Sequence, residues 1–110
     1  MIAVVSQCWS LDEGPHLDAY ERHYREFLDF HRQHRGFRGR QLFRGIADPC
    51  HLTNVRFFDE VAAYEELIAL PGYATHIERL TEHIDVTRVP PKEYAQLIVN
   101  DGPAGFSPLR

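Results

Sequence analysis

The side chains best suited to chemistry in this chain are a histidine and an amide in apolar surroundings. His76 lies on an apolar helical stretch, and its imidazole could contact a ligand or transfer a proton, because an unperturbed histidine has a pKa of about 6.5. Asn54 lies in a strand-like stretch, on the same side as Leu52 and Arg56, where its amide could orient a substrate carbonyl. The alternatives are a histidine that only packs and an amide that only satisfies the backbone.

Three aromatic residues could line a pocket for an aromatic substrate. Trp9 ends the first apolar stretch, where its indole could hold a ring or anchor the packing of one sheet on another. Tyr64 and Tyr73 lie on the apolar side of a helical stretch, where a phenol is more often part of the core than catalytic. Our hypothesis assigns substrate binding to Trp9, Tyr64 and Tyr73, and catalysis to His76 and Asn54.

The histidines and cysteines do not form a metal-binding pattern. His31 and His34 are three residues apart at the end of a predicted helix, but no carboxylate or cysteine completes a known ligand spacing. Basic side chains at a helix C-terminus suit the helix dipole, which accounts for both without a metal. No export signal precedes Cys8 and Cys50, so we expect two separate reduced thiols in a cytoplasmic protein.

Length and composition limit the chain to one ordinary globular domain. It has 110 residues, of which 44% are hydrophobic and 25% charged, and these fractions exclude global disorder. No apolar run approaches the roughly 20 residues that a membrane span needs. The net charge of −4 argues against binding the phosphate backbone of nucleic acids, which basic side chains must neutralise. We therefore expect neither a nucleic-acid nor a membrane partner.

Apolar periodicity predicts the elements that must position these side chains. Residues 2–9 are β-branched and apolar and predict a strand. The apolar stripe from Leu17 to His31 predicts one amphipathic helix, which Gly36 ends.

The second half of the chain repeats this order. Residues 37–46 and 51–58 predict two strands of a hairpin. Helical periodicity over 61–84 is interrupted at Pro71-Gly72, and residues 94–100 predict the last strand.

The order of elements predicts an α+β, ferredoxin-like βαββαβ fold, with an antiparallel four-stranded sheet and two helices on one face. Residues 1–100 form this domain, and 101–110 form a C-terminal tail that we expect to be flexible or to contact a dimer partner. Alternation in the last strand assigns Ala95, Leu97 and Val99 to the helix side and leaves Tyr94 and Ile98 on the open face.

The open face of this sheet keeps apolar side chains such as Val5 and Trp9. A half-apolar face that no helix covers is typical of an association surface. Pairing two such sheets about a two-fold axis covers both faces. We therefore predict a homodimer through the open sheet face.

Three segments of the chain resemble the antibiotic biosynthesis monooxygenase family, which consists of small dimeric α+β-barrel proteins. Residues 36–42 (GFRGRQL) look like the family's approach to its second strand. Residues 55–63 (VRFFDEVAA) are similar to its step from a strand through an acidic cap into a helix, and 70–76 (LPGYATH) look like the break in its second helix. Their order and spacing are more specific together than each segment alone.

The resemblance implies a dimeric α+β barrel with no metal, flavin or other cofactor, which oxygenates a small aromatic or polyketide-like substrate. Haem-degrading relatives share the fold and use an Asn on the first strand with a Trp and a His on the second helix. His76 matches that His, but Leu67 stands at the Trp position and Gln7 is the nearest counterpart of the Asn. We therefore rank haem degradation below the other functional hypotheses.

Two functions remain in competition. In the first, a base removes an acidic proton from a substrate such as an anthrone, and the carbanion reacts with oxygen in a dry pocket. In the second, the barrel binds a small molecule without catalysis, since one fold hosts unrelated functions. A pocket of a few hundred Å³ with His76 on its wall would favour the enzyme.

Overall fold

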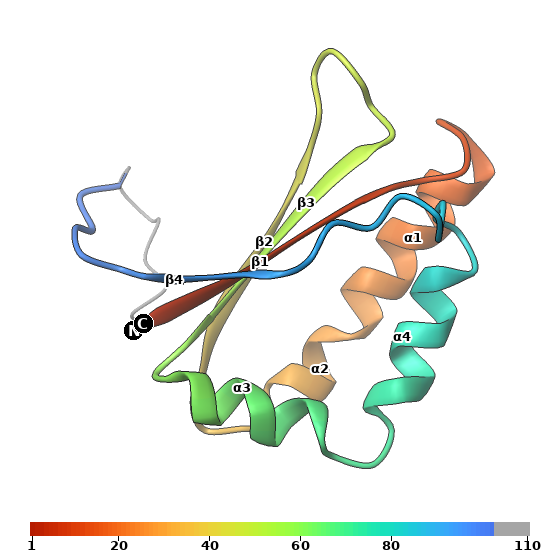
Figure 1. Ribbon diagram of the computed structural model, residues 1–110. Coiled ribbons are helices and arrows are strands. Elements are labelled where there is room, and N and C mark those ends of the chain that lie inside the picture. Colours follow the sequence, from red (N-terminus) through yellow and green to blue (C-terminus); the bar gives the residue numbers. More distant parts are fainter. Residues whose placement is uncertain (103–110) are drawn as a thin grey trace.

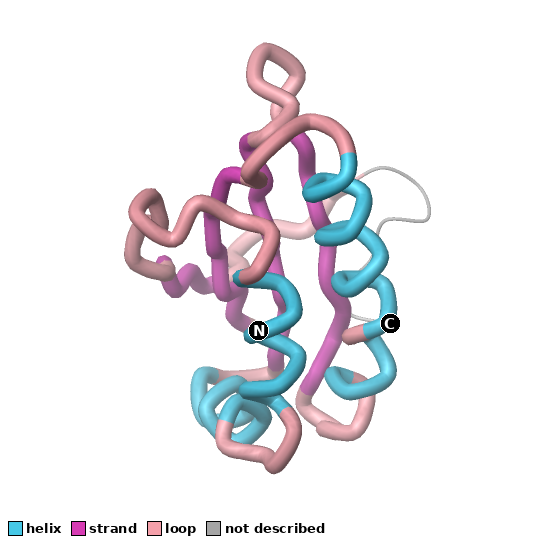
Figure 2. Tube along the Cα trace, turned by 90° about the vertical axis from the view of Figure 1, so that its right-hand side faces the viewer, coloured by secondary structure: helices cyan, strands magenta, loops and turns pink. Residues whose placement is uncertain are grey.

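The computed structural model describes residues 1–102, in which helices lie on one side of a four-stranded antiparallel sheet (Figures 1 and 2). The sheet order is β2-β3-β1-β4, so the α+β, ferredoxin-like fold predicted from the sequence is confirmed. The elements in chain order are β1 (Ile2–Trp9), α1 (Pro15–Glu26), α2 (Leu28–His31), β2 (Phe37–Arg44), β3 (His51–Phe58), α3 (Val61–Ile68), α4 (Tyr73–Thr81) and β4 (Glu93–Gln96).

The register of the two central strands decides which side chains face the helices. Val4 of β1 lies opposite Arg56 of β3, and Ser6 lies opposite Asn54. Residues directly opposite in an antiparallel pair share a face, and Val4 and Cys8 are buried beneath the helices. We call this helix-covered side the inner face and the opposite side the outer face.

The first predicted helix is divided and ends earlier than expected. α1 ends at Glu26, α2 begins at Leu28, and residues 32–36 form turns rather than helix. The amide of Phe27 donates to the carbonyls of both His23 and Tyr24, which tightens the chain at that point. Gly36 therefore lies beyond the helix that it was expected to end.

The break predicted at Pro71-Gly72 separates α3 from α4. Gly72 has a φ of 96°, in the left-handed region that a side chain disfavours. A Cβ at this position would also lie 3.3 Å from the ring of Phe30. The short turn lets α4 double back against α1, with which it forms the helical layer over the sheet (Figure 1).

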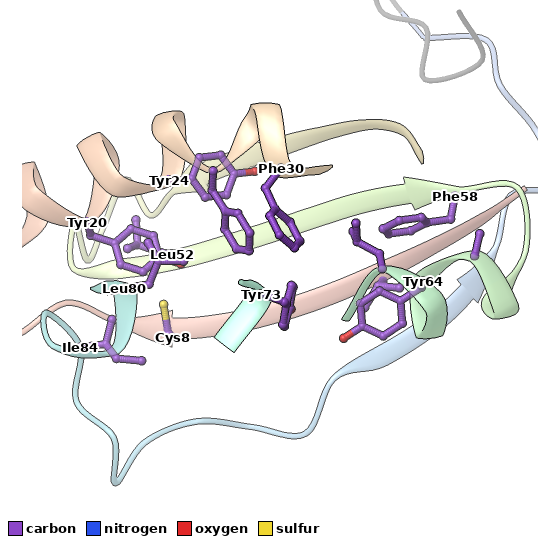
Figure 3. Packing of buried hydrophobic residues seen from close by; sticks show 14 of the residues in the cluster. Cys8, Tyr20, Tyr24, Phe30, Leu52, Phe58, Tyr64, Tyr73, Leu80 and Ile84 are labelled. Atoms are coloured by element: carbon purple, nitrogen blue, oxygen red, sulfur yellow. The ribbon is translucent and has the colours of Figure 1, made fainter. Parts of the chain in front are cut away.

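The core lies between the helices and the inner face. Tyr20, Leu80 and Ile84 gather near Cys8 at one end of this layer, whereas Phe58 and Tyr64 lie at the other end (Figure 3). Val4, Phe58 and Leu67 have no exposed surface. Burying such side chains contributes about 1.5–3 kcal/mol each, so this layer holds the sheet and helices together.

The last strand faces the opposite way from the sequence prediction. Tyr94 lies opposite Val4, so it points to the inner face. There its ring packs edge-to-face with that of Tyr64, with ring centroids 5.9 Å apart. Ala95 lies opposite Ala3 on the outer face. The assignment of Ala95 to the helix side was therefore wrong. β4 also ends at Gln96, four residues before the predicted Asn100.

Most of the predicted C-terminal tail, 101–110, lies outside the described residues. Within residues 1–102, no helix combines the length and the apolar character needed to cross a bilayer.

Candidate functional site

A cavity of about 210 Å³ lies between the inner face and helices α1 and α4. Its walls are mostly aromatic and aliphatic, with a few polar groups from the two central strands. The segment that leads from α4 to β4 contributes Val89 and Lys92 at one side. The remaining lining residues are Ser6, Gln7, Cys8, Tyr20, Tyr24, Phe27, His31, Asn54, Arg56, Tyr73, Ile77, Leu80, Thr81 and Ile84. An apolar cavity with a few convergent polar groups is typical of a small-molecule site.

A larger groove, of about 610 Å³, lies between α1, α2 and the edge strand β2. Charged side chains form much of its wall, and two of them, Arg25 and Arg32, keep 75% and 66% of their side chains exposed. Exposed charges are well solvated and need no ligand. The inner-face cavity is the better candidate because several of its polar atoms are buried without partners.

The amide of Asn54 is held in one orientation on the cavity wall. The hydroxyl of Tyr24 donates to its Oδ1 at 2.8 Å, and burial raises the pKa of Tyr24 to about 12, so this phenol keeps its proton. The Asn54 amide nitrogen has no hydrogen-bond partner within residues 1–102. It is therefore free to donate to an oxygen in the cavity.

His31 lines the same cavity with one nitrogen unpaired. Its Nδ1 lies 2.9 Å from the carbonyl oxygen of Phe27, whereas its buried Nε2 has no partner within the described chain. Burial, with repulsion from Arg56 and Arg40, lowers the pKa of His31 to about 4 despite the Phe27 bond. The ring is neutral at pH 7, and a carbonyl can only accept, so Nδ1 carries the proton and Nε2 a lone pair.

Arg56 places a positive charge in the cavity wall. It is 3% exposed, and its Nη1 donates to the hydroxyl of Tyr73 at 3.0 Å. Burial alone would lower the pKa of Arg56, but the phenols of Tyr73 and Tyr64 outweigh it and hold that pKa above its usual range. The guanidinium therefore remains charged.

The other polar groups of the cavity stay neutral. Burial raises the pKa of Tyr20 well above its usual range, and it also raises the pKa of Cys8. The Oγ of Ser6 is buried without a partner in the described part of the chain. The cavity therefore presents an uncharged, largely apolar surface, broken by the cations of Arg56 and Lys92.

Two of the predicted site residues lie on this cavity and one lies behind it. Asn54 and Tyr73 line it. Tyr64 is not among the lining residues, but its hydroxyl accepts from Lys92 at 2.7 Å and from Arg56 at 3.5 Å. Tyr64 therefore supports the cationic end of the cavity without forming its wall.

His76 lies outside the cavity wall. Its ring stacks on Phe27, with centroids 4.5 Å apart and planes 10° apart, whereas the edge of the His31 ring meets the same Phe27. Burial and the nearby Arg79 lower the pKa of His76, and Glu26 opposes them. The structure thus brings His31, rather than His76, to the cavity.

Trp9 lies on the outer face, away from the cavity. Its indole stacks on His51 at 4.4 Å, and the guanidinium of Arg88 lies 3.9 Å from the ring centroid. The His51 Nε2 lies 2.8 Å from Oε1 of Gln7. These contacts hold the indole in place on the outer face, where a second sheet could pack against it.

Two cavity residues, His31 and Arg56, escaped the sequence analysis. His31 stands on the apolar stripe of the first helix, and its explanation by the helix dipole was wrong because the ring is buried and neutral. Arg56 alternates with Leu52, Asn54 and Phe58 on one face of β3. A charged residue at a core position of a strand was the available signal.

Metal ligands do not gather in the described structure. Within residues 1–102, no three His, Cys, Asp or Glu side chains are placed to hold one ion. The absence of a metal or other cofactor stays a prediction.

No family model matches the chain, and no curated protein matches its sequence. Solved structures do match its fold. The cofactor-independent oxygenase SnoaB from Streptomyces nogalater is 15% identical, with a TM-score of 0.70 over 92% of this chain and 94% of its own. A Bordetella bronchiseptica protein described as a candidate antibiotic biosynthesis monooxygenase is 15% identical, with a TM-score of 0.76 over 89% and 97%.

A Deinococcus radiodurans protein with the same description is 18% identical, with a TM-score of 0.70 over 94% of this chain and all of its own. At such identities the likeness shows the fold. The α+β, ferredoxin-like fold of one subunit is therefore confirmed, whereas the dimeric barrel that the resemblance implied stays a prediction. The chemistry is argued below from the cavity.

Proposed function

We propose that this protein is a cytoplasmic member of the antibiotic biosynthesis monooxygenase family that oxygenates a small aromatic or polyketide-like substrate without a cofactor. The observation that carries the proposal is the inner-face cavity of about 210 Å³, in which a neutral imidazole nitrogen and an amide nitrogen lack partners. An unpaired buried polar atom such as this imidazole nitrogen is costly, and a substrate that pairs with it relieves that cost.

The proposed reaction needs a proton acceptor and a hydrogen-bond donor. The lone pair on Nε2 of His31 takes a proton from an activated methylene of the substrate, and the Asn54 amide donates to the oxyanion that forms. The substrate supplies all four electrons that reduce O2: the methylene loses both hydrogens, one oxygen atom becomes a ring carbonyl and the other leaves as water. Exclusion of bulk water protects the carbanion until oxygen arrives.

The base is assigned to His31 because it is the imidazole on the cavity wall. His76, the base predicted from the sequence, has Phe27 stacked against its ring. A candidate base must reach the proton that it abstracts, and a ring separated from the cavity by a phenyl group does not. Tyr73 and the apolar wall would bind the ring system, with Tyr64 supporting the cationic end from behind.

The outer face supports the proposed homodimer. Val5 and Val55 lie opposite one another there, and Trp9 lies on the same face. Phe43, also on this face, is 53% exposed. A second copy of this sheet, packed face to face, would cover all four side chains.

One observation favours the alternative, a small-molecule-binding protein without catalysis. The best general bases have pKa values near the working pH, whereas the pKa of His31 is about 4. The same nitrogen would then only accept a hydrogen bond from a bound ligand. A haem-degrading role has less support, because Leu67 is fully buried in the core and offers no ring to a ligand.

Oxygen uptake separates these functions. The purified protein is mixed with a panel of anthrones in an oxygen electrode, with and without a chelator, and compared with His31→Gln. The proposal predicts uptake that the chelator leaves unchanged and that the substitution lowers by about 10²–10⁴-fold. Ligand binding with no uptake by any member of the panel would favour the binding protein.

A further inference from the structure

The charge of the cavity is opposite to the charge of the chain. The whole sequence has a net charge of −4, yet the lining residues include two cations, Arg56 and Lys92, and no Asp or Glu. Lys92 is exposed to solvent, whereas Arg56 is 3% exposed. The buried charge of Arg56 is therefore the feature that needs an explanation.

The guanidinium of Arg56 has only neutral partners. Its Nη1 and Nη2 donate to the hydroxyls of Tyr73 and Tyr64, and its buried Nε has no partner within residues 1–102. Among the described residues, no Asp or Glu lies within ion-pair distance. Fully buried arginines are almost always paired with an anion, so this one lacks its usual counterpart.

The charge cannot be relieved by loss of a proton. Arginine stays protonated in proteins, and the two phenols hold the pKa of Arg56 above its usual range. Of its five N–H donors, the phenols occupy two. Arg56 therefore lines a cavity large enough for a small molecule, and its buried Nε–H is a charged donor without a partner in the described chain.

We propose that the cavity selects a compact aromatic ligand with an anionic oxygen, a carboxylate or an enolate, and that Arg56 is the residue that determines this preference. The anion would supply the missing counterion and accept from Nε. The apolar end of the cavity, formed by Tyr20, Leu80 and Ile84 (Figure 3), would take the ring. Such a ligand satisfies at once the groups that the protein leaves unpaired.

Neighbouring groups fit the same ligand. The Nε2 of His31 and the Oγ of Ser6 are also buried on this wall without partners in the described chain. Repulsion from Arg56 contributes to the low pKa of His31, so an anion between them would raise that pKa and draw a proton onto the ring. Anion binding and proton uptake are therefore coupled in this cavity.

The inference rests on the proposed function only for the identity of the anion. In an oxygenase, the ionised substrate is the species that reacts with O2, and Arg56 would stabilise its oxygen. In a binding protein, a carboxylate would occupy the same position. Both cases share an anionic oxygen attached to an aromatic system, so the test uses one probe of each kind.

The experiment compares isosteric probes by isothermal titration calorimetry at pH 7. The probes are 2-naphthoate, which carries a carboxylate, and 2-naphthamide, which has nearly the same shape and no charge. A third probe, 2-naphthol, reports in its absorption spectrum whether it binds as the phenolate, which separates an enolate-like preference from a carboxylate preference. Two variants, Arg56→Met and Lys92→Met, each remove one cation from the cavity.

We expect wild-type protein to bind the acid at least about 30-fold more tightly than the amide, which is typical of removing one partner from a buried charge pair. Arg56→Met should abolish this preference, whereas Lys92→Met should retain most of it because the exposed ammonium is screened by solvent. Equal affinities of acid and amide in the wild type, or no binding of the acid at millimolar concentration, would overturn the proposal even if Arg56→Met does not fold.

The outcome for the anion site can be distinguished from the outcome for the proposed oxygenase activity. A strong preference for the acid without oxygen uptake would support the anion site and contradict the oxygenase. Oxygen uptake without any acid preference would support the oxygenase and contradict the anion site.

Discussion

Both faces of the sheet have polar side chains, but the surroundings of these side chains differ between the two faces. On the inner face, Asn54 and Arg56 are enclosed by helices and line a cavity. On the outer face, Trp9 and His51 stack flat on each other. Successive strand residues point to opposite faces, so one strand, β3, contributes alternately to both.

This comparison shows how enclosure changes what a side chain does. His31 and His51 are both imidazoles near the sheet, but burial lowers the pKa of His31 to about 4, whereas His51 is only partly buried and bonds Gln7. A cavity covered by helices gives polar groups unusual properties. The open face instead offers area for association.

The largest effect is expected from the buried imidazole. His31→Gln keeps a similar volume and removes the lone pair on Nε2, so turnover should fall by about 10²–10⁴-fold. Turnover is measured by oxygen uptake on the substrate that wild-type protein accepts. The same assay on His76→Gln decides between the two histidines. A large loss of turnover in His76→Gln with none in His31→Gln would show that His76, and not His31, is the base.

The pH profile gives an independent check on this assignment. A base must be unprotonated, so activity should rise with pH through a single step near 4, the pKa of His31. If His76 is the base, the step instead follows the pKa of His76, which burial lowers from the ordinary value of about 6.5.

Adjacent residues of β3 test the comparison of the two faces directly. Asn54→Val removes the amide that we assign to the developing oxyanion, and turnover should fall by about 10²–10³-fold, as for loss of one such donor. Thr53→Val, one position earlier on the outer face, is the matched control and should have little effect on turnover. Equal losses of turnover in Asn54→Val and Thr53→Val would contradict the assignment of catalysis to the inner face alone.

Stability should depend on pH through His31. Its pKa is about 4 in the folded protein and about 6.5 in the unfolded chain, so the unfolded state binds the extra proton first. The free energy of unfolding is then fully present above pH 6.5 and falls by about 3 kcal/mol as the pH drops from 6.5 to 4. Urea unfolding at several pH values measures this loss. His31→Gln should flatten the curve, and an unchanged slope in that variant would show that His31 is not its source.

The smallest of these effects is expected on the outer face. Trp9→Ala removes a large aromatic surface from the proposed dimer contact, and the dimer should dissociate about 30-fold more readily, as for a typical hot-spot residue. Sedimentation at several concentrations measures this change. A wild-type protein that is monomeric at micromolar concentration would contradict the dimer itself.

The strands with strong local patterns were predicted well. The bounds of β1 and β3 match the prediction because both strands are rich in β-branched and aromatic residues. β4 was placed on the wrong face because alternation identifies two sets of residues and not which set faces inward. Pairing of Tyr94 with Val4 of β1 decides that, and this register is a tertiary property.

The candidate site was predicted only in part. Strand alternation placed Asn54 on the correct face, and helix periodicity placed Tyr73 on the correct side. Both residues line the cavity. His31 and Arg56 were missed because a polar residue in an apolar stripe looks the same in sequence whether it lies at the surface or is buried. Only the packing of α1 and α4 over the sheet shows that both are enclosed.

The central claim is that the inner-face cavity performs a cofactor-independent oxygenation, and labelled oxygen tests it most directly. Wild-type and His31→Gln protein, both treated with chelator, are incubated under oxygen-18 gas with an anthrone that the wild type accepts. The mass of the product is then measured by mass spectrometry. The account predicts one labelled oxygen atom per product molecule with wild-type protein and a large loss of labelled product with the variant. Equal labelled product from both proteins, or a product oxygen derived from water, would contradict it.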